Sequence, residues 1–158
     1  MAQEKTQKIK ENNNSLAIVV RISGLVKVRK EIEETLYRLK LRKKYAAILI
    51  DLNDKNIKGM LEKVKHYIAY GEIDKATLAK LLNARAKSIE GDKKEIKIDA
   101  EKTAEELIAG KKLKDFKLKP FFRLHPPRKG INSKLQYPKG VLGNNKKDIN
   151  KLVKNMLG

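Results

Sequence analysis

The longest apolar stretches of the chain are short, rich in β-branched residues and bounded by polar turns. Residues 16–22 and 45–52 both have this pattern, which is typical of strands buried on both faces. Residues 67–73 could extend the helical spacing before them, but Gly71 and the aromatic residues favour a strand. Two strands alone would make a poor sheet. The sequence therefore predicts three strands.

Amphipathic helices are predicted between and after these strands. Apolar residues recur every three or four positions, as they do along the buried face of a helix, in residues 28–39, 57–64, 75–87 and 149–156. The last of these segments lies in a terminal helix predicted at 146–157. Asp54 and Asp74 are expected to act as N-caps. A capping-box pattern at 103–106 predicts a further short helix that ends at Gly110.

The remaining segments lack a regular pattern. Residues 111–144 hold all four prolines and are expected to be irregular, and the polar residues 1–14 are expected to form a disordered tail. A chain of 158 residues has the usual size of one domain, and we find no internal repeat in it. We therefore expect a single α+β domain at residues 15–158.

The charge of the chain is strongly unbalanced. Lys and Arg number 38 against 19 Asp and Glu, which gives a formal net charge of +19. Residues 107–158 carry 14 of the basic residues and only two acidic ones, so the surplus is concentrated in the C-terminal third. Because such a surplus is self-repulsive in a compact monomer, it indicates a polyanionic partner, of which nucleic acid is the commonest.

Composition disfavours a membrane partner and several kinds of site. Aromatic residues make up 5% of the chain and Trp is absent, so docking on a lipid surface is poorly supported. The longest apolar run, residues 46–50 with Tyr45 before it, is far shorter than the ~20 residues that span a bilayer. The polar N-terminus does not resemble a signal peptide. The absence of Cys excludes disulfides and cysteine-based metal or thiol sites. We therefore expect a soluble intracellular protein.

Two basic regions are candidate nucleic-acid contacts. Residues 117–139 interleave basic residues with aromatic rings and prolines, a combination that can neutralise phosphates and stack on bases. At least one of Phe121 and Phe122 is expected to be a core anchor instead. The second region flanks the first two predicted strands, where loops commonly carry binding residues. The candidates are Lys27, Arg29, Lys30, Arg42, Lys43, Arg123, His125, Arg128, Lys129, Lys134, Tyr137 and Lys139.

Signals for other functions are weaker. Asp51 and Asp54 follow a predicted strand, where a magnesium-dependent nuclease could hold its metal, although turn and capping roles are favoured. His66 is interpreted as a partly exposed structural residue, and His125 has no acid–base partner nearby in the sequence. A further alternative is a regulator in which helices at 58–65 and 75–87 form a helix-turn-helix.

Three motifs resemble the family of the thirtieth large-subunit ribosomal protein, in its archaeal form. RISG at 21–24 precedes an amphipathic helix, KGMLEKVKHYIAYGEI occupies 58–73, and RLHPPRKG, the most specific of the three, occupies 123–130. The resemblance covers nearly all of residues 16–157. Bacterial members correspond only to the first half, whereas the eukaryotic counterpart, large-subunit protein seven, shares the second.

The resemblance implies both a fold and a role. The implied fold is a β-α-β-α-β core at 15–73, with a ferredoxin-like, three-stranded antiparallel sheet and helices on one face, followed by a helical and irregular extension at 74–158. The implied role is that of a non-enzymatic structural constituent of the cytoplasmic large ribosomal subunit. Its partners would be large-subunit ribosomal RNA, with the 5S RNA region nearby, and neighbouring ribosomal proteins. No cofactor, metal or small-molecule substrate is implied.

The resemblance also bears on individual residues. Lys27, Arg29 and Lys30 match a loop with which the family contacts RNA. The motif of the extension is matched by Arg123, His125, Arg128 and Lys129.

Overall fold

The structure, a computed structural model, describes most of the chain after the N-terminal tail. The described residues are 16–24, 26–85, 99–109, 116, 118–128, 130–131, 135–137 and 139–157. The tail predicted at 1–14 lies outside them. The larger elements are β1 (Leu16–Arg21), α2 (Lys30–Arg38), β2 (Ala46–Asp51), α3 (Lys55–Val64), β3 (Ile68–Glu72), α4 (Lys75–Arg85), α5 (Ala100–Ile108) and α6 (Ile149–Met156).

The sheet contains the three predicted strands and two short ones that the sequence did not predict. β1 lies in the middle and pairs antiparallel with β2 and β3. β4 (Phe122–Arg123) adds antiparallel to β2, and β5 (Gly143–Asn144) adds parallel to β3, which gives the order β4-β2-β1-β3-β5. The expectation of a three-stranded sheet is therefore corrected to five strands. A strand of two residues is too short to have a detectable period.

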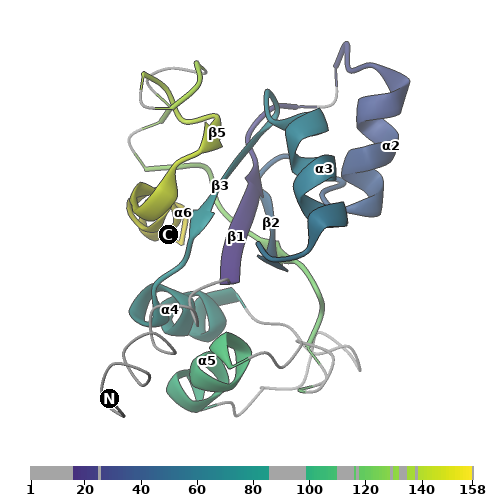
Figure 1. Ribbon diagram of the computed structural model, residues 1–158. Coiled ribbons are helices and arrows are strands. Elements are labelled where there is room, and N and C mark those ends of the chain that lie inside the picture. Colours follow the sequence, from purple (N-terminus) through teal and green to yellow (C-terminus); the bar gives the residue numbers. More distant parts are fainter. Residues whose placement is uncertain are drawn as a thin grey trace, which may run out of the picture.

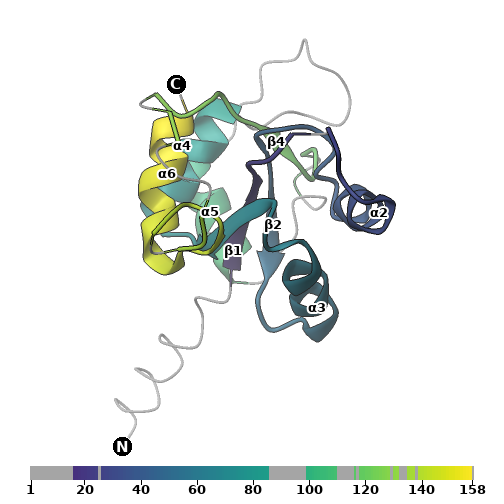
Figure 2. The same ribbon diagram turned by 90° about the horizontal axis from the view of Figure 1, so that it is seen from above.

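Both faces of the sheet are covered, which explains the continuous apolar pattern of β1. Ile18 and Val20 pack into one core with residues of α4, α5 and α6, and Ala17 and Val19 pack into a second core with residues of α2 and α3. Figures 1 and 2 show the two groups of helices on opposite sides of the strands. The core helices α2 and α3 thus share one face, as expected, while helices of the second half of the chain cover the other.

The two sets of helices also rule out the helix-turn-helix that was considered as an alternative. That motif needs two helices joined by a short turn. Here β3 separates α3 from α4, and the two helices bury their apolar residues on opposite faces of the sheet. The pair therefore cannot enter one groove of a duplex together.

Helix starts agree with the sequence in one case and differ in another. The side chain of Asp54 accepts a hydrogen bond from the backbone N–H of Asn56 (3.0 Å) and caps α3, as expected. The prediction that residues 103–106 form a capping box was wrong. α5 begins at Ala100, its N-cap is Asp99, and Thr103 is buried inside the helix. The pattern of Thr followed three residues later by Glu also occurs within helices, where it caps nothing.

The chain ends in a short 3₁₀ turn and a helix. η2 (Lys146–Asp148) leads into α6, so the terminal helix predicted at 146–157 starts three residues later as an α-helix. Ile149, Val153 and Met156 are fully buried, as their spacing predicted. Among the described residues, no helix combines the length and apolar character needed to cross a membrane.

Candidate nucleic-acid interface

A buried arginine connects two basic loops at one end of the sheet. Arg21, the last residue of β1, is only 1% exposed. Its guanidinium group donates to the backbone oxygens of Ser23 (3.1 Å), Gly24 (3.3 Å) and Leu41 (2.8 Å). Burial lowers the pKa of Arg21, and the negative charge of Glu33 partly offsets this effect. The side chain is therefore a structural cation that holds the β1–α2 and α2–β2 loops together.

The two loops present most of the basic residues predicted in the first half of the chain. Lys27, Arg29 and Lys30 are exposed on the first loop and at the start of α2. Arg42 and Lys43 are exposed on the second loop. Because Arg21 bonds to both loops, it links the segments that carry the two predicted clusters, one at the start and one just after the end of α2.

The second loop starts with a strained residue. α2 ends in a Schellman motif, in which the N–H of Leu41 bonds to the oxygen of Leu36 (2.9 Å) and the N–H of Lys40 to that of Tyr37 (3.0 Å). This motif places its C′ residue in the left-handed region, where glycine is normally found. Here that residue is Lys40, with a φ of 64°. The chain thus keeps a cation at a position where glycine would be less strained.

Lys40→Gly is expected to raise the free energy of unfolding by about 1 kcal/mol, because glycine adopts the left-handed conformation without a Cβ clash. Chemical denaturation of the two proteins measures the difference. Lys80→Gly is the matched control, since Lys80 is an exposed residue inside α4, where glycine should instead cost about 1 kcal/mol. Destabilisation by both substitutions would contradict the left-handed conformation of Lys40.

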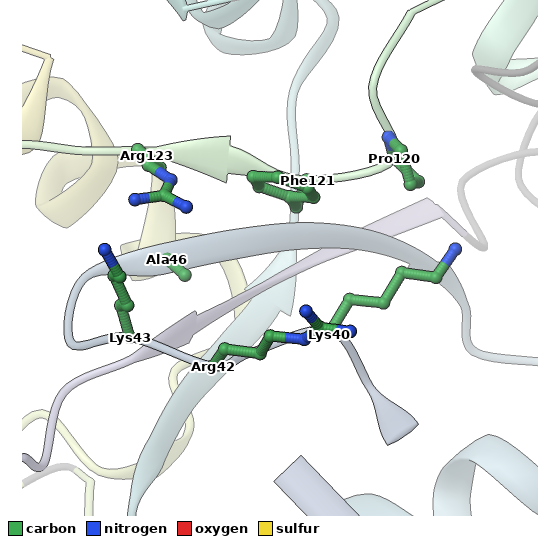
Figure 3. A pocket seen from close by; sticks show the side chains of 7 residues that line it. All are labelled: Lys40, Arg42, Lys43, Ala46, Pro120, Phe121 and Arg123. Carbon is green, nitrogen blue, oxygen red and sulfur yellow. The ribbon is translucent and has the colours of Figure 1, made fainter. Parts of the chain in front are cut away.

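β4 brings a distant basic residue to the same surface. Arg123 pairs with Ala46 across the β2–β4 ladder, and the N–H of Leu124 bonds to the oxygen of Tyr45 (3.1 Å). Residues of the second loop and of β4 then line a cavity of about 280 Å³, formed by Lys40, Arg42, Lys43, Ala46, Pro120, Phe121 and Arg123. Figure 3 shows Phe121 and Arg123 on one side of the β2 ribbon and Arg42 and Lys43 on the other. Four of these lining residues are basic and none is acidic.

Phe121, just before β4, and Phe122, the first residue of β4, lie on opposite faces of the sheet. Phe122 is 1% exposed and belongs to the core shared with α4, α5 and α6, so the expected core anchor is confirmed. Phe121 lies half-exposed on the opposite face. The guanidinium carbon of Arg123 lies 5.6 Å from the centre of the Phe121 ring, and that of Arg42 lies 4.1 Å from the centre of the Tyr37 ring. Both arginines are therefore oriented by cation–π contacts.

The cations of this surface have no acidic partners among the described residues. The ion pairs found there join Lys65 to Glu62, Lys75 to Glu105 and Lys102 to Asp99, and all involve exposed side chains. None of these pairs includes a residue of the basic loops or of the cavity. The loops and the cavity can therefore neutralise an external polyanion without first breaking an ion pair to any described residue.

The rest of the RLHPPRKG motif runs along the end of α6. The backbone N–H groups of His125 and Arg128 donate to the oxygens of Met156 (3.0 Å) and Asn155 (3.3 Å). These bonds satisfy carbonyls that the last turn of a helix leaves free. The side chains of His125 and Arg128 are exposed, whereas Pro127 is buried. The motif thus fixes the terminal helix with its backbone and presents its polar side chains to solvent.

The remaining predicted contacts lie elsewhere. Lys139 is exposed, and the hydroxyl group of the half-buried Tyr137 donates a hydrogen bond to Asp148. This hydrogen bond is the main reason why the pKa of Tyr137 is raised, with burial and the negative charge of Asp148 adding to it. Lys129 and Lys134 fall outside the described residues. The structure therefore brings Arg42, Lys43 and Arg123 together but leaves Tyr137 engaged in a local contact.

The carboxylates considered for metal binding have local roles. Asp51 accepts a hydrogen bond from the backbone N–H of Asn53 (2.9 Å), and Asp54 caps α3. His66 is exposed, with Nδ1 3.2 Å from Nε2 of Gln136. In the described part of the chain no group of three or more His, Asp or Glu residues is placed to hold a metal ion. The turn and capping roles favoured by the sequence are confirmed for Asp51 and Asp54.

Two residues of this surface were not recognised as such from the sequence. Lys40 was not among the candidate contacts, and Arg21 was only part of a motif. The signal for Arg21 was a lone charge next to the apolar residues of a buried strand. Since a charge is rarely buried without partners, such a residue indicates a structural role for its side chain. No local pattern indicates the left-handed backbone of Lys40.

Comparison with known proteins agrees with this architecture. The sequence model of the family described as "Ribosomal protein L30p/L7e" matches residues 17–68. Proteins named large ribosomal subunit protein uL30 extend the similarity. The one from Archaeoglobus fulgidus is 44% identical over 149 residues, which cover 87% of this chain and 97% of the relative. That from Desulfurococcus amylolyticus is 38% identical over 160 residues, covering 90% and 98%. That from Nanoarchaeum equitans is 42% identical over 129 residues, covering 76% and 82%. The chain therefore belongs to the L30p/L7e family of ribosomal proteins.

Proposed function

We propose that this chain is a structural constituent of the large ribosomal subunit and binds large-subunit ribosomal RNA through its basic loops. The observation that carries the proposal is the convergence of Arg42, Lys43 and Arg123 from two distant segments on one surface, with no acidic residue in the lining of the cavity they share. The relatives are named as proteins of the large ribosomal subunit, and this is why we propose that subunit as the particle. The role is non-enzymatic and belongs to the cytoplasm.

The proposed contacts divide into three groups. Lys27, Arg29 and Lys30 form the first loop, and Arg42, Lys43 and Arg123 form the cavity region. His125, Arg128, Lys129, Lys134, Tyr137 and Lys139 would extend the contact along the second half of the chain. We further propose that residues 15–73 form the core of the domain and residues 74–158 an extension of it, with the 5S RNA region and other ribosomal proteins as neighbours.

The logarithm of the association constant for a large-subunit RNA transcript is expected to fall linearly with the logarithm of the salt concentration. The slope is about −0.7 to −0.9 per phosphate contacted, because each contact releases a condensed counterion. Arg29→Gln is expected to make this slope shallower by about one contact and to weaken binding by about 1.5–3 kcal/mol. Filter binding at several salt concentrations measures both quantities.

Lys80→Gln is the control for this experiment, since it removes one positive charge from the exposed face of α4. It should leave the slope unchanged. The Arg29 side chain makes no capping hydrogen bond, so its replacement should not disturb α2. A response to salt that is flat for the unmodified protein, or a chain that sediments apart from large subunits in a sucrose gradient, would overturn the proposed function.

A further inference from the structure

We propose that the cavity between the α2–β2 loop and β4 binds one unpaired nucleotide of the RNA, with its base stacked on Phe121 and its phosphate held by the surrounding cations. The inference rests on the proposed function and deepens it, because it assigns a single-stranded ligand to one part of the basic surface. The remaining basic loops would contact phosphates without regard to base pairing.

The lining of the cavity has separate polar and apolar parts. Arg42, Lys43 and Arg123 supply positive charge, while Ala46, Pro120 and Phe121 supply apolar contact surface. All of these residues line the same cavity, and Figure 3 shows the ring of Phe121 beside Arg123, with Lys40 and Arg42 across the β2 ribbon in that view. Phosphate alone would be bound by the cations and would gain nothing from a phenyl ring. A nucleotide uses both parts, because it joins a charged phosphate to a flat apolar base.

The size of the cavity fits a small ligand. Its volume of about 280 Å³ is at or below the low end of the ~300–1,000 Å³ that is typical of small-molecule sites. One nucleotide is therefore a better match than a larger cofactor or a stack of bases. A base inside an A-form duplex is paired, stacked and out of reach of side chains, so the ligand must come from a bulge, a loop or a strand end.

The aromatic ring is placed for stacking. Phe121, which immediately precedes β4, is half-exposed although its neighbour Phe122 is buried in the core, because successive side chains of an extended segment point to opposite faces. The Arg123 guanidinium group lies 5.6 Å from the Phe121 ring centre, so the two could together offer a surface to a base. Phenyl rings and guanidinium planes are the groups on which proteins commonly stack splayed bases.

Two of the cations around the ring, Arg42 and Arg123, are oriented by aromatic contacts before any ligand binds. Arg42 is packed 4.1 Å from the centre of the Tyr37 ring, and the strained backbone of Lys40 fixes the start of the loop. Backbone strain of this kind persists where the surrounding structure enforces it, and it is often found at binding sites. A fixed site loses less conformational entropy on binding, which favours a specific nucleotide position over general attraction.

The test compares a single-stranded RNA hexamer with a blunt RNA duplex that is long enough to stay paired, with affinities expressed per phosphate. The probes are labelled at one end, and binding is followed by fluorescence anisotropy with the full chain. The unmodified protein should prefer the single strand. Phe121→Leu should weaken single-strand binding by roughly 5- to 150-fold, the usual loss for one stacked base, and should leave duplex binding unchanged. Phe121→Tyr should retain the preference, because tyrosine keeps the aromatic face.

Phe121→Leu conserves net charge and apolar character, so the salt dependence should not change with the affinity. A hexamer that contains 2-aminopurine gives a second reading, since stacking on Phe121 should quench its fluorescence with the unmodified protein. Equal binding of the two probes, unchanged binding by Phe121→Leu, or the absence of quenching would each overturn the inference. These results would leave the proposed function intact as long as the large-subunit transcript still binds with the expected salt dependence.

Discussion

Replacing Gly71 with alanine is expected to lower the free energy of unfolding by about 3 kcal/mol or more. A Cβ atom at this position in β3 would lie 2.2 Å from the backbone oxygen of Lys146 and 2.9 Å from Cγ2 of Ile149. Overpacking a core costs about 1–3 kcal/mol where side chains can move, and the cost is larger here because a backbone oxygen is in the way. For a chain of this length the melting temperature should fall by roughly 6–12 °C, measured by circular dichroism.

Gly59→Ala is the matched control. Gly59 lies inside α3, and no atom is found within 4 Å of a Cβ built on it. Alanine should therefore stabilise the protein by about 0.5–1 kcal/mol, because it favours the helix and restricts the unfolded chain. If the Gly71→Ala variant had the same melting temperature as the unmodified protein, η2 and the start of α6 could not pack as closely on β3 as the structure has them.

Gly71 illustrates which parts of the fold could be predicted from the sequence. The three long strands and the helices between them follow from local apolar patterns, and their positions are confirmed to within a few residues. Gly71 was recognised as favouring a strand over a helix. Its main role, which is to let η2 and α6 approach β3, depends on residues far away in the chain and has no local signal.

The same limit applies to β4 and to the candidate site. The basic character of the two loops was predictable, because it is a local matter of composition. The cavity was not, because it depends on the pairing of Ala46 with Arg123 across a two-residue strand. The start of α5 was placed too late for a related reason. Thr103 fits a capping pattern locally, but it lies on the buried face of the helix, which begins three residues earlier at Ala100.

Arg21→Met is expected to reduce both stability and RNA binding. The substitution removes three charge-assisted hydrogen bonds to backbone oxygens. Ser23 and Gly24 are half-buried, so water can replace the bonds to their oxygens, but Leu41 is fully buried and its oxygen would be left without that donor. An unsatisfied buried acceptor costs about 1–3 kcal/mol. The variant no longer buries a charge, which offsets part of the total cost of losing the three bonds. We therefore expect the free energy of unfolding, measured by urea denaturation, to fall by about 2–3 kcal/mol.

The effect of Arg21→Met on RNA is separable from its effect on stability. Arg21 is buried and cannot itself reach a phosphate, yet it holds the loops that carry Arg29 and Arg42. Under conditions where the variant is still folded, binding to the large-subunit transcript should weaken at least about tenfold, a 1.4 kcal/mol change. Arg38→Met, on the exposed side of α2, removes the same charge and should change stability by less than about 0.5 kcal/mol. If the folded Arg21→Met variant bound the transcript as tightly as the unmodified protein, the two loops would be positioned without the buried guanidinium, and the basic surface would not depend on it.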